Sequence, residues 1–505
     1  VARPDSSDKT LLDLEPGNLR LGWTYETLEN YPLEAFMTPP AHWGVRITPQ
    51  IDGKPFAQST WRRAEDYLPI LVNQYTDPEG SVTLEVTGGA TAAIVKISMT
   101  NTGSARHTFR FFSESQRGFF GYNPGYVDSD MDKDHLLAGW GERADRVIAL
   151  AVGAPVYGIQ GATHLCPTWE LNPGESATGW IIRPYRAYTA DVPALRKHDW
   201  RQEADQAATE WRSLIGSLTP ITLPDTGVLN AFKACFSDLF IMREPVAEGY
   251  IAGTPGTDGY RAPNSGEPSI TSIVLDQFGR HDEAYKGYQM PLVQQGDDGN
   301  WADPKGWGHL CWGTSGFKAW TVMEHYRLTG DRAYLEKVYP RMRACSLFQE
   351  KQRARTRKLV NGERPLTYGL MPRGMGDCGL KDGDDLYGVF YPHNFWALFA
   401  DKCSAEAADI LGKAEDAKML RGIFDTAWAD LRQSLEKGCI TEGDYRWIPG
   451  VPGKTDGSRW GAINVLMPCH LLPSDDPLDE GNLKKIRAAM SPGGLPINTG
   501  WMPKG

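Results

Sequence analysis

The sequence lacks several features that would point to particular classes of protein. No stretch approaches the ~20 consecutive apolar residues of a membrane-spanning helix, and the longest candidate, residues 147–159, is interrupted by Gly153, Pro155 and Gly158. No basic stripe offsets the net charge of −10, which argues against a nucleic-acid partner. The eight cysteines show no CxxC spacing, so neither a zinc site nor a dense disulfide framework is predicted.

Sequence motifs for cofactors and metals are also scarce. No GxGxxG, P-loop, GxSxG or HExxH motif occurs in the context that each requires, and no organic cofactor is predicted. Asp128, Asp130 and Asp132 alternate along the chain in the manner of calcium ligands. Lys133 and Gly139 replace the glycine and glutamate of an EF-hand loop, so a solvated acidic turn is the competing interpretation.

Aromatic residues, in contrast, are abundant in segments that otherwise resemble loops. The chain has 17 tryptophans and 20 tyrosines, and many of the tryptophans lie beside glycine or aspartate. Aromatic faces in polar loops suit the apolar C–H faces of sugar rings. The alternative is that large helical proteins use such rings to fill their loops. The tryptophans that we consider candidates for sugar binding are Trp301, Trp307, Trp312, Trp447 and Trp460.

Alternating apolar and polar residues dominate the first 190 residues. Residues 93–100 alternate, a turn follows at 101–104, and a second alternating run continues through Phe111. The same pattern recurs on both sides of the turn at 172–175, so both places are predicted to be β-hairpins. Short strands separated by Pro and Gly turns predict a large antiparallel β-sandwich over residues 1–190.

The pattern changes to helical periodicity near Asp199. A connecting helix is predicted over 199–218, within a linker spanning 191–226, and its apolar residues repeat at helical spacing. Residues 227–505 are predicted to form a domain of helical hairpins. Nine helices are expected, at 227–243, 269–279, 281–295, 315–330, 331–356, 392–412, 413–438, 459–472 and 479–490.

The connections between these helices alternate between tight and long. Tight turns follow Gly279, Gly330 and Gly412, where glycine suits the left-handed conformation that ends a helix. In a stack of antiparallel helices, successive connections lie at opposite ends, so the long connections are expected to share one end. Because loops on a rigid scaffold carry function, we expect the site among them. The long connections are 244–268, 296–314, 357–391, 439–459 and the residues after 491.

This β-sandwich, linker helix and set of helical hairpins together resemble the six-hairpin toroid glycosidases, which include glucoamylases, processing α-glucosidases and α-L-rhamnosidases. The segment from Tyr368 to Gly379, followed by residues 391–396, looks like the loop that supplies the general acid in processing α-glucosidases and trehalases. The resemblance implies that Asp377 is that acid, although Gly376 interrupts the motif. A closed toroid has twelve helices, so nine imply an incomplete toroid. The general base then lies beyond the given sequence or is arranged differently.

Glycoside hydrolysis requires a proton donor and a carboxylate that activates water or attacks carbon. Carboxylates in the long loops are the candidates, with turn capping as the alternative for Asp377 and helix-dipole complementation as the alternative for Glu267. The candidate catalytic residues are Asp377, Glu267, Asp303 and Glu442. The candidate substrate-binding residues are Asp258, Tyr260, Arg261, His309 and His393, together with the five tryptophans above.

These observations predict a glycoside hydrolase whose partner is an oligo- or polysaccharide, and which is exo-acting because the long loops can close a pocket over the mouth of the toroid. The resemblance implies that it is inverting. One alternative is a polysaccharide lyase or sugar epimerase acting on a uronate through Tyr260, Arg261 and His309. The second alternative is a non-catalytic glycan-binding protein. The chain begins at Val1 rather than Met, so removal of a leader and a periplasmic or secreted location are expected, with the cytoplasm left open. The sequence does not indicate the sugar, the linkage or the oligomeric state.

Overall fold

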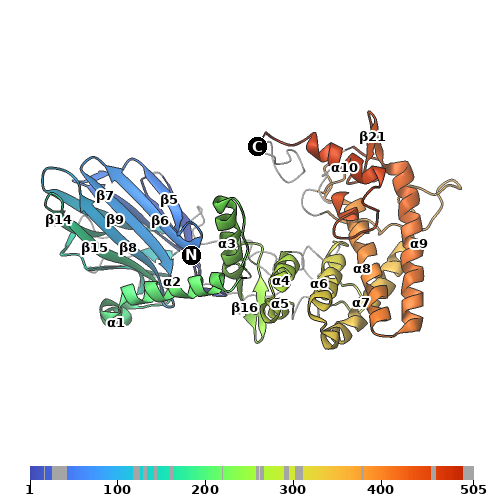
Figure 1. Cartoon of the computed structure of the whole chain (residues 1–505), viewed down its shortest axis with the longest axis horizontal. Coiled ribbons are helices and arrows are strands. Elements are labelled where there is room, and N and C mark those ends of the chain that lie inside the picture. The colour runs from blue at the N-terminus through green and yellow to red at the C-terminus, as the bar shows by residue number, and fades with distance from the viewer. Residues whose placement is uncertain are drawn as a thin grey trace. The chain divides into compact units, whose positions relative to one another are not determined.

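The structure is a computed structural model and consists of two compact units, Val1–Ala262 and Pro263–Gly505 (Figure 1). Among the helices of the described residues, none combines the length and apolar composition needed to cross a bilayer. The structure describes residues 1–15, 17–24, 43–117, 126–128, 134–140, 145–158, 164–218, 220–257, 261, 267–288, 295–301, 311–376, 380–455 and 462–492.

Two antiparallel sheets form most of the first unit. In the first sheet the order is β1 (Leu11–Asp13), β2 (Leu19–Trp23), β3 (Trp43–Ile51), β9 (His107–Arg117), β14 (His164–Leu171) and β13 (Val156–Gly158), with β4 (Lys54–Pro55) on β3. In the second sheet the order is β10 (Tyr126–Asp128), β11 (His135–Trp140), β12 (Arg146–Val152), β15 (Ser176–Pro184), β8 (Ala92–Asn101), β7 (Gly80–Gly88), β6 (Leu68–Asp77) and β5 (Ser59–Ala64).

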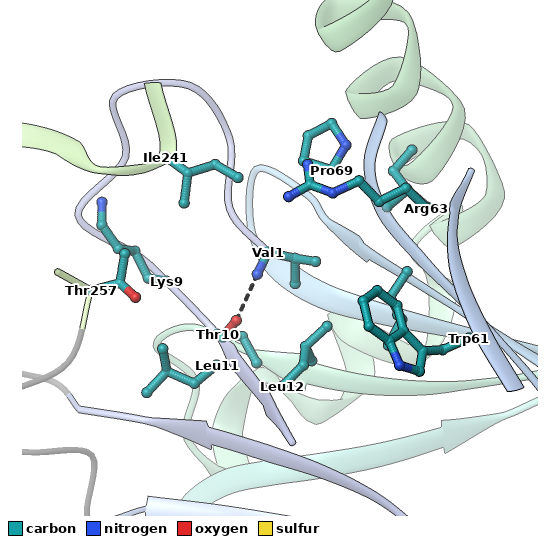
Figure 2. A pocket seen from close by; sticks show the side chains of 12 residues that line it. Val1, Lys9, Thr10, Leu11, Leu12, Trp61, Arg63, Pro69, Ile241 and Thr257 are labelled. Atoms are coloured by element: carbon teal, nitrogen blue, oxygen red, sulfur yellow. Dashed lines mark hydrogen bonds between the residues drawn. The ribbon is translucent and has the colours of Figure 1, made fainter. Parts of the chain in front are cut away.

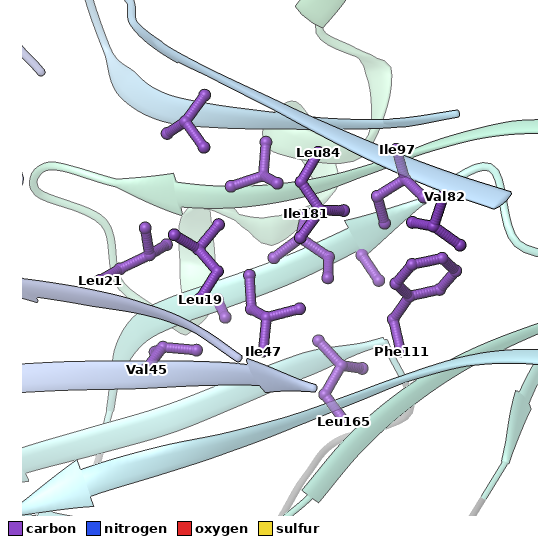
Figure 3. Packing of buried hydrophobic residues seen from close by; sticks show 14 of the residues in the cluster. Leu19, Leu21, Val45, Ile47, Val82, Leu84, Ile97, Phe111, Leu165 and Ile181 are labelled. Carbon is purple, nitrogen blue, oxygen red and sulfur yellow. The ribbon is translucent and has the colours of Figure 1, made fainter. Parts of the chain in front are cut away.

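The core of this unit lies between the two sheets. Figure 3 shows Leu84 and Ile181 of the second sheet facing Ile47 and Leu165 of the first, and all four side chains are fully buried. Alternate residues of each strand contribute to this layer because side chains of a strand point to opposite faces. The predicted antiparallel β-sandwich is confirmed. Burial of apolar surface, at roughly 25 cal/mol per Å², is the main stabilising contribution.

Both predicted hairpins are wrong, although their strands and turns exist. β8 and β9 lie in different sheets, and so do β14 and β15, so each turn carries the chain across the sandwich. The buried amide of Asn101 donates to the carbonyl oxygens of Ala105 and Leu171, both at 2.8 Å, and thereby joins the two crossings. Turn residues mark a chain reversal, but they do not encode whether the reversed strand pairs with its predecessor.

Three helices and a short hairpin complete the first unit. After a turn of 3₁₀ helix at Thr189–Asp191, α1 spans Val192–Lys197, α2 spans Trp200–Gly216 and α3 spans Thr226–Ile241. The connecting helix α2 is confirmed, and it buries Trp200 and Trp211. Its N-cap, Asp199, accepts a hydrogen bond from the Gln202 backbone, which satisfies one of the first free N–H groups. The hairpin β16 (Arg243–Ala247) and β17 (Tyr250–Gly253) follows.

The second unit is built from antiparallel helices. The bounds are α4 (Glu267–Gln277), α5 (His281–Gly287), α6 (Thr314–Thr329), α7 (Arg332–Thr356), α8 (Tyr391–Ile410), α9 (Ala414–Gly438) and α10 (Pro477–Arg487). Two small hairpins lie in the long loops, β18 (Gly374–Met375) with β19 (Tyr387–Gly388), and β20 (Ile440–Glu442) with β21 (Tyr445–Trp447). The helical-hairpin architecture expected for this region is confirmed.

The tight turns form as expected, whereas one predicted helix does not. Gly330 has φ 73°, and Asp331 accepts a hydrogen bond from the Tyr334 backbone to cap α7. The α-helix predicted over 459–472 is wrong. Its described part is a short 3₁₀ helix, Ala462–Val465 (η4), followed by turns. Pro468 disfavours a helix here, because a proline in a helix interior removes one backbone hydrogen bond and clashes with the preceding turn.

Candidate active site

Described parts of three long loops meet around the start of α8. The Trp312 indole donates to the Pro372 carbonyl at 2.8 Å, which joins the loop at 296–314 to the loop at 357–391. The Tyr391 backbone N–H donates to the Gly450 carbonyl at 3.0 Å, which joins α8 to the loop at 439–459. An ion pair between Lys454 and Asp382 connects the last two loops again. For these three loops, the contacts agree with the expectation that the long connections share one end of the helices. For the connection at 244–268 and the residues after 491, it stays a prediction.

The residues on both sides of the segment 377–379 are held in place. Before that segment, the Gly376 backbone donates to the Leu386 carbonyl at 2.5 Å, next to the β18–β19 hairpin. A Cβ at Gly376 would lie 2.0 Å from the Leu380 carbonyl oxygen, so only glycine fits there. After the segment, Leu380 packs with Phe390 and Val451 in a buried cluster. Residues 377–379 themselves lie outside the described residues, so the position of the Asp377 carboxyl stays a prediction.

His393 lies in the first turn of α8 and is buried. Its Nε2 is 3.6 Å from the Cys311 Sγ, and the Phe390 ring packs edge-on against the imidazole. Burial lowers the pKa of His393 to about 4, so the ring is neutral near pH 7. Nδ1 has no hydrogen-bond partner among the described residues. A neutral imidazole in this position can exchange hydrogen bonds with a ligand oxygen, but it supplies no positive charge.

Two side chains that hold this region were missed by the sequence analysis. The Asn394 side-chain oxygen accepts a hydrogen bond from the Met371 backbone at 2.8 Å, and its amide donates to the Phe390 carbonyl at the same distance. The second such side chain is Cys311, which contacts His393. The start of α8 thereby binds Met371, in the segment that precedes β18 and Asp377. The sequence gives no sign of either role. Each residue contacts a segment outside its own helix or loop, and hydrophobic periodicity reports only local structure.

The described candidate tryptophans are all buried. Trp301, Trp312 and Trp447 are 1%, 7% and 3% exposed. Trp312 packs against Phe348 with ring centroids 6.2 Å apart, and the Trp301 carbonyl accepts a hydrogen bond from Lys318 at 2.8 Å. In this structure the three rings hold the loops and do not present an open face for stacking. Their part in sugar binding stays a prediction.

Glu442 belongs to the described residues, and its carboxylate is bound by neighbouring side chains. It forms an ion pair with Lys485 and accepts a hydrogen bond from the Trp447 indole at 3.0 Å. The Lys485 ammonium also lies 4.9 Å from the centroid of the Trp447 ring. The contact with Lys485 is the main reason that the pKa of Glu442 is lowered. An ionised, paired carboxylate is unsuited to donate a proton, although it retains the charge that a base requires.

Arg261 is a buried structural cation in the first unit. Its Nη2 donates to Glu244 at 2.5 Å and to the Ser7 carbonyl at 2.9 Å, and its side chain is 3% exposed. Lys9 approaches the same Glu244 carboxylate at 3.4 Å. The guanidinium is thus engaged by the protein itself, and its expected role as a clamp for substrate would require these bonds to break.

The remaining candidates fall on residues whose placement is not described. These are Asp258, Tyr260, Asp303, Trp307, His309, Asp377 and Trp460. Glu267 opens α4, but its side chain is not described. Asp128 ends β10, while Asp130 and Asp132 lie outside the described residues. Within the part of the chain that the structure describes, no group of three His, Cys, Asp or Glu could hold a metal ion, and the calcium site stays a prediction.

Beside the β20–β21 hairpin lies a buried acid that the sequence did not single out. Asp479 of α10 is 2% exposed, and neither carboxylate oxygen has a hydrogen-bond partner among the described residues. One turn later, the Asn482 side-chain oxygen accepts a hydrogen bond from the Ile448 backbone at 2.7 Å. Burial, assisted by the nearby Asp476, raises the pKa of Asp479 to about 6.

We expect Asp479 to make the stability of this protein depend on pH. Its folded-state pKa of about 6 exceeds the unfolded value of about 3.9, so the folded state binds the proton more tightly. The free energy of unfolding should therefore fall as pH rises from about 4 to about 6, by about 3 kcal/mol at most. Asp479→Asn should remove this dependence. Urea unfolding between pH 4 and pH 7 measures it, with the exposed Asp475→Asn as control, and an unchanged slope in Asp479→Asn would contradict the assignment.

Comparison with solved structures gives the class of fold. The chain is similar to a crystal structure of a bacterial glucoamylase in complex with acarbose, with a TM-score of 0.64 and 11% sequence identity. The match covers 98% of this chain and 79% of the glucoamylase chain. No protein-family model matches the sequence, and no curated protein matches it. The likeness confirms the expected architecture of a β-sandwich followed by a helical toroid, and at this identity it shows the fold alone.

Proposed function

We propose that this protein is a glycoside hydrolase that cleaves O-glycosidic bonds of an oligo- or polysaccharide. The observation that carries the proposal is the meeting of three long loops around the start of α8, in a chain with the fold of a glucoamylase. In this proposal Asp377 is the general acid that protonates the leaving oxygen. Because that glucoamylase was crystallised with acarbose, we propose an oligosaccharide of similar kind as ligand of this chain.

We further propose that the enzyme is exo-acting and inverts the anomeric carbon. In an inverting mechanism, the acid protonates the glycosidic oxygen while a second carboxylate activates water on the opposite face of the ring. The two carboxyl groups lie ~6.5–9.5 Å apart to make room for that water. Asp303 and Glu267 are candidates for the base, and the ionised Glu442 is a third. The base takes one proton from the attacking water and the acid gives one to the glycosidic oxygen, so protons balance over the reaction.

Two observations favour hydrolysis over the uronate chemistry of a lyase or epimerase. A uronate carboxylate must be neutralised by a cation before the neighbouring proton can leave, and Arg261 is the cation that this alternative requires. Arg261 is instead bound to Glu244 and buried. His393 is neutral because burial lowers its pKa to about 4, so it does not replace the missing charge.

A glycan panel tests the proposal. The purified chain is incubated with soluble α- and β-linked oligosaccharides of glucose, mannose, galactose and rhamnose, and with polyuronates. We expect new reducing ends from at least one neutral glycan, with acarbose-type inhibitors tested as competitors. Ultraviolet-absorbing unsaturated products from a polyuronate would favour the lyase instead. Saturable glycan binding without any product would support the non-catalytic alternative.

A further inference from the structure

A pocket of about 230 Å³ opens on the β-sandwich unit, and no part of the proposed reaction uses it (Figure 2). Its walls come from the first residues of the chain, the edge strand β5, the start of β6 and the last residue of α3. Figure 2 shows Trp61 and Arg63 on one side, and Leu11, Leu12 and Thr10 on the other. None of the described lining residues is an aspartate or glutamate, so the pocket is suited to binding and not to hydrolysis.

The apolar wall has an accessible aromatic ring. Trp61 is 62% exposed, although Leu71 beside it in the pocket is buried. β5 is the last strand of its sheet, so the indole borders the open edge of the sandwich. Contact with the apolar face of a ligand would remove this ring from water, which is favourable. A ligand of this pocket should therefore have at least one apolar face.

The cations that line the pocket are already paired. The Arg63 Nη2 lies 2.9 Å from both carboxylate oxygens of Asp238. The Lys9 ammonium lies 3.4 Å from Glu244, and burial lowers the pKa of Lys9 to about 8. An anionic ligand would have to displace an existing carboxylate, so a neutral ligand fits better.

The pocket also offers a hydroxyl group to a ligand. Thr257 lies in its lining and is half-buried, so its side chain is accessible from the pocket. Thr10 lines the pocket as well, but its side-chain hydroxyl is buried and closed to a ligand. The Thr10 backbone carbonyl accepts a hydrogen bond from the Val1 nitrogen at 2.7 Å.

We propose that this pocket is a carbohydrate-binding site that holds one neutral pyranose ring, with its C–H face on Trp61 and a hydroxyl on Thr257. Its volume is below the ~300–1,000 Å³ of sites for drug-sized ligands, so one ring fits and an oligosaccharide extends outward. The site goes beyond the proposed hydrolysis, because it retains a glycan without cleaving it. An apolar peptide segment is the competing occupant.

Isothermal titration of the full chain with methyl α-glucoside, methyl α-mannoside and methyl β-galactoside tests the proposal. We expect saturable binding of at least one, weakened about tenfold or more by Trp61→Ala and also weakened by Thr257→Val, while Trp61→Phe retains most of it. Val156→Ala removes a side chain that is 57% exposed on β13 and should leave binding unchanged. Unchanged thermal melting of Trp61→Ala shows that the fold is intact.

Two further measurements distinguish sugar binding at this pocket from hydrolysis at the proposed active site. Asp377→Asn should retain the binding that depends on Trp61, and a chain that hydrolyses no glycan should retain it too, so the two proposals can fail independently. Absence of binding for the whole panel, or equal affinity of Trp61→Ala and the parent chain, would overturn the carbohydrate site. Binding of a leucine-rich peptide that depends on Trp61, with no sugar bound, would assign the pocket to a protein segment instead.

Discussion

Asp377→Asn is expected to lower turnover on natural glycosides by about 10²–10⁴-fold, the contribution of a lost general acid, with little change in KM. Asparagine keeps the shape of the side chain but cannot donate the proton. The flanking residues Gly376 and Leu380 are each held by contacts of their own, so the substitution should not loosen the described parts of the loop. Steady-state kinetics on the best oligosaccharide of the panel measures the effect.

The control for this variant is a carboxylate in the same loop. Asp384 is exposed, and Asp384→Asn should leave turnover unchanged. A substrate with an activated leaving group needs little protonation and should recover much of the rate that Asp377→Asn loses. Retention of more than about a third of the turnover by Asp377→Asn on a natural glycoside would rule out the acid role.

Arg353→Met is expected to destabilise the protein by about 3–5 kcal/mol, the usual effect of leaving a buried charge unpaired. The Arg353 Nη1 lies 2.6 Å from the Asp401 carboxylate, and the side chains are 1% and 0% exposed. Burial raises the pKa of Asp401, and Arg353 opposes that rise. The pair joins α7 to α8, the helices on either side of the loop that contains Asp377. Denaturant unfolding at pH 7 measures the loss.

A double variant distinguishes the unpaired charge from lost packing. Arg353→Met with Asp401→Leu replaces both charges by apolar groups, so it should recover most of the stability that the single variant loses. If the double variant is no more stable than Arg353→Met, the pair contributes through packing and the electrostatic explanation is wrong.

The sequence predicted local structure well where a residue acts on its own neighbours. Asp199 and Asp331 cap the helices that follow them, and Gly330 ends the helix before it, as their residue types indicate. The predicted pairing of the strands around Asn101 was wrong, because β8 and β9 belong to different sheets. The Asn101 amide binds the carbonyl groups of Ala105 and Leu171, which are distant from each other in sequence. Those contacts are made only after the sheets assemble, and no local pattern encodes them.

The candidate site shows the same division between local and tertiary information. Loop lengths predicted which segments meet, but Cys311 and His393 are 82 residues apart and have no sequence signal for their contact. Tryptophans beside glycine suggested sugar platforms, yet Trp301 and Trp447 are buried, while the exposed Trp61 lies on an edge strand. Exposure depends on what packs over a side chain, which composition alone does not determine.

The origin of the oxygen in the product tests the proposed hydrolysis most directly. The reaction is run in water enriched in heavy oxygen, and the released sugar is examined by mass spectrometry and, at early times, by proton NMR. Hydrolysis predicts one heavy oxygen at the new anomeric centre, and inversion predicts that the first anomer released is opposite to that of the substrate. A product that lacks the heavy oxygen and contains a new double bond would contradict the account.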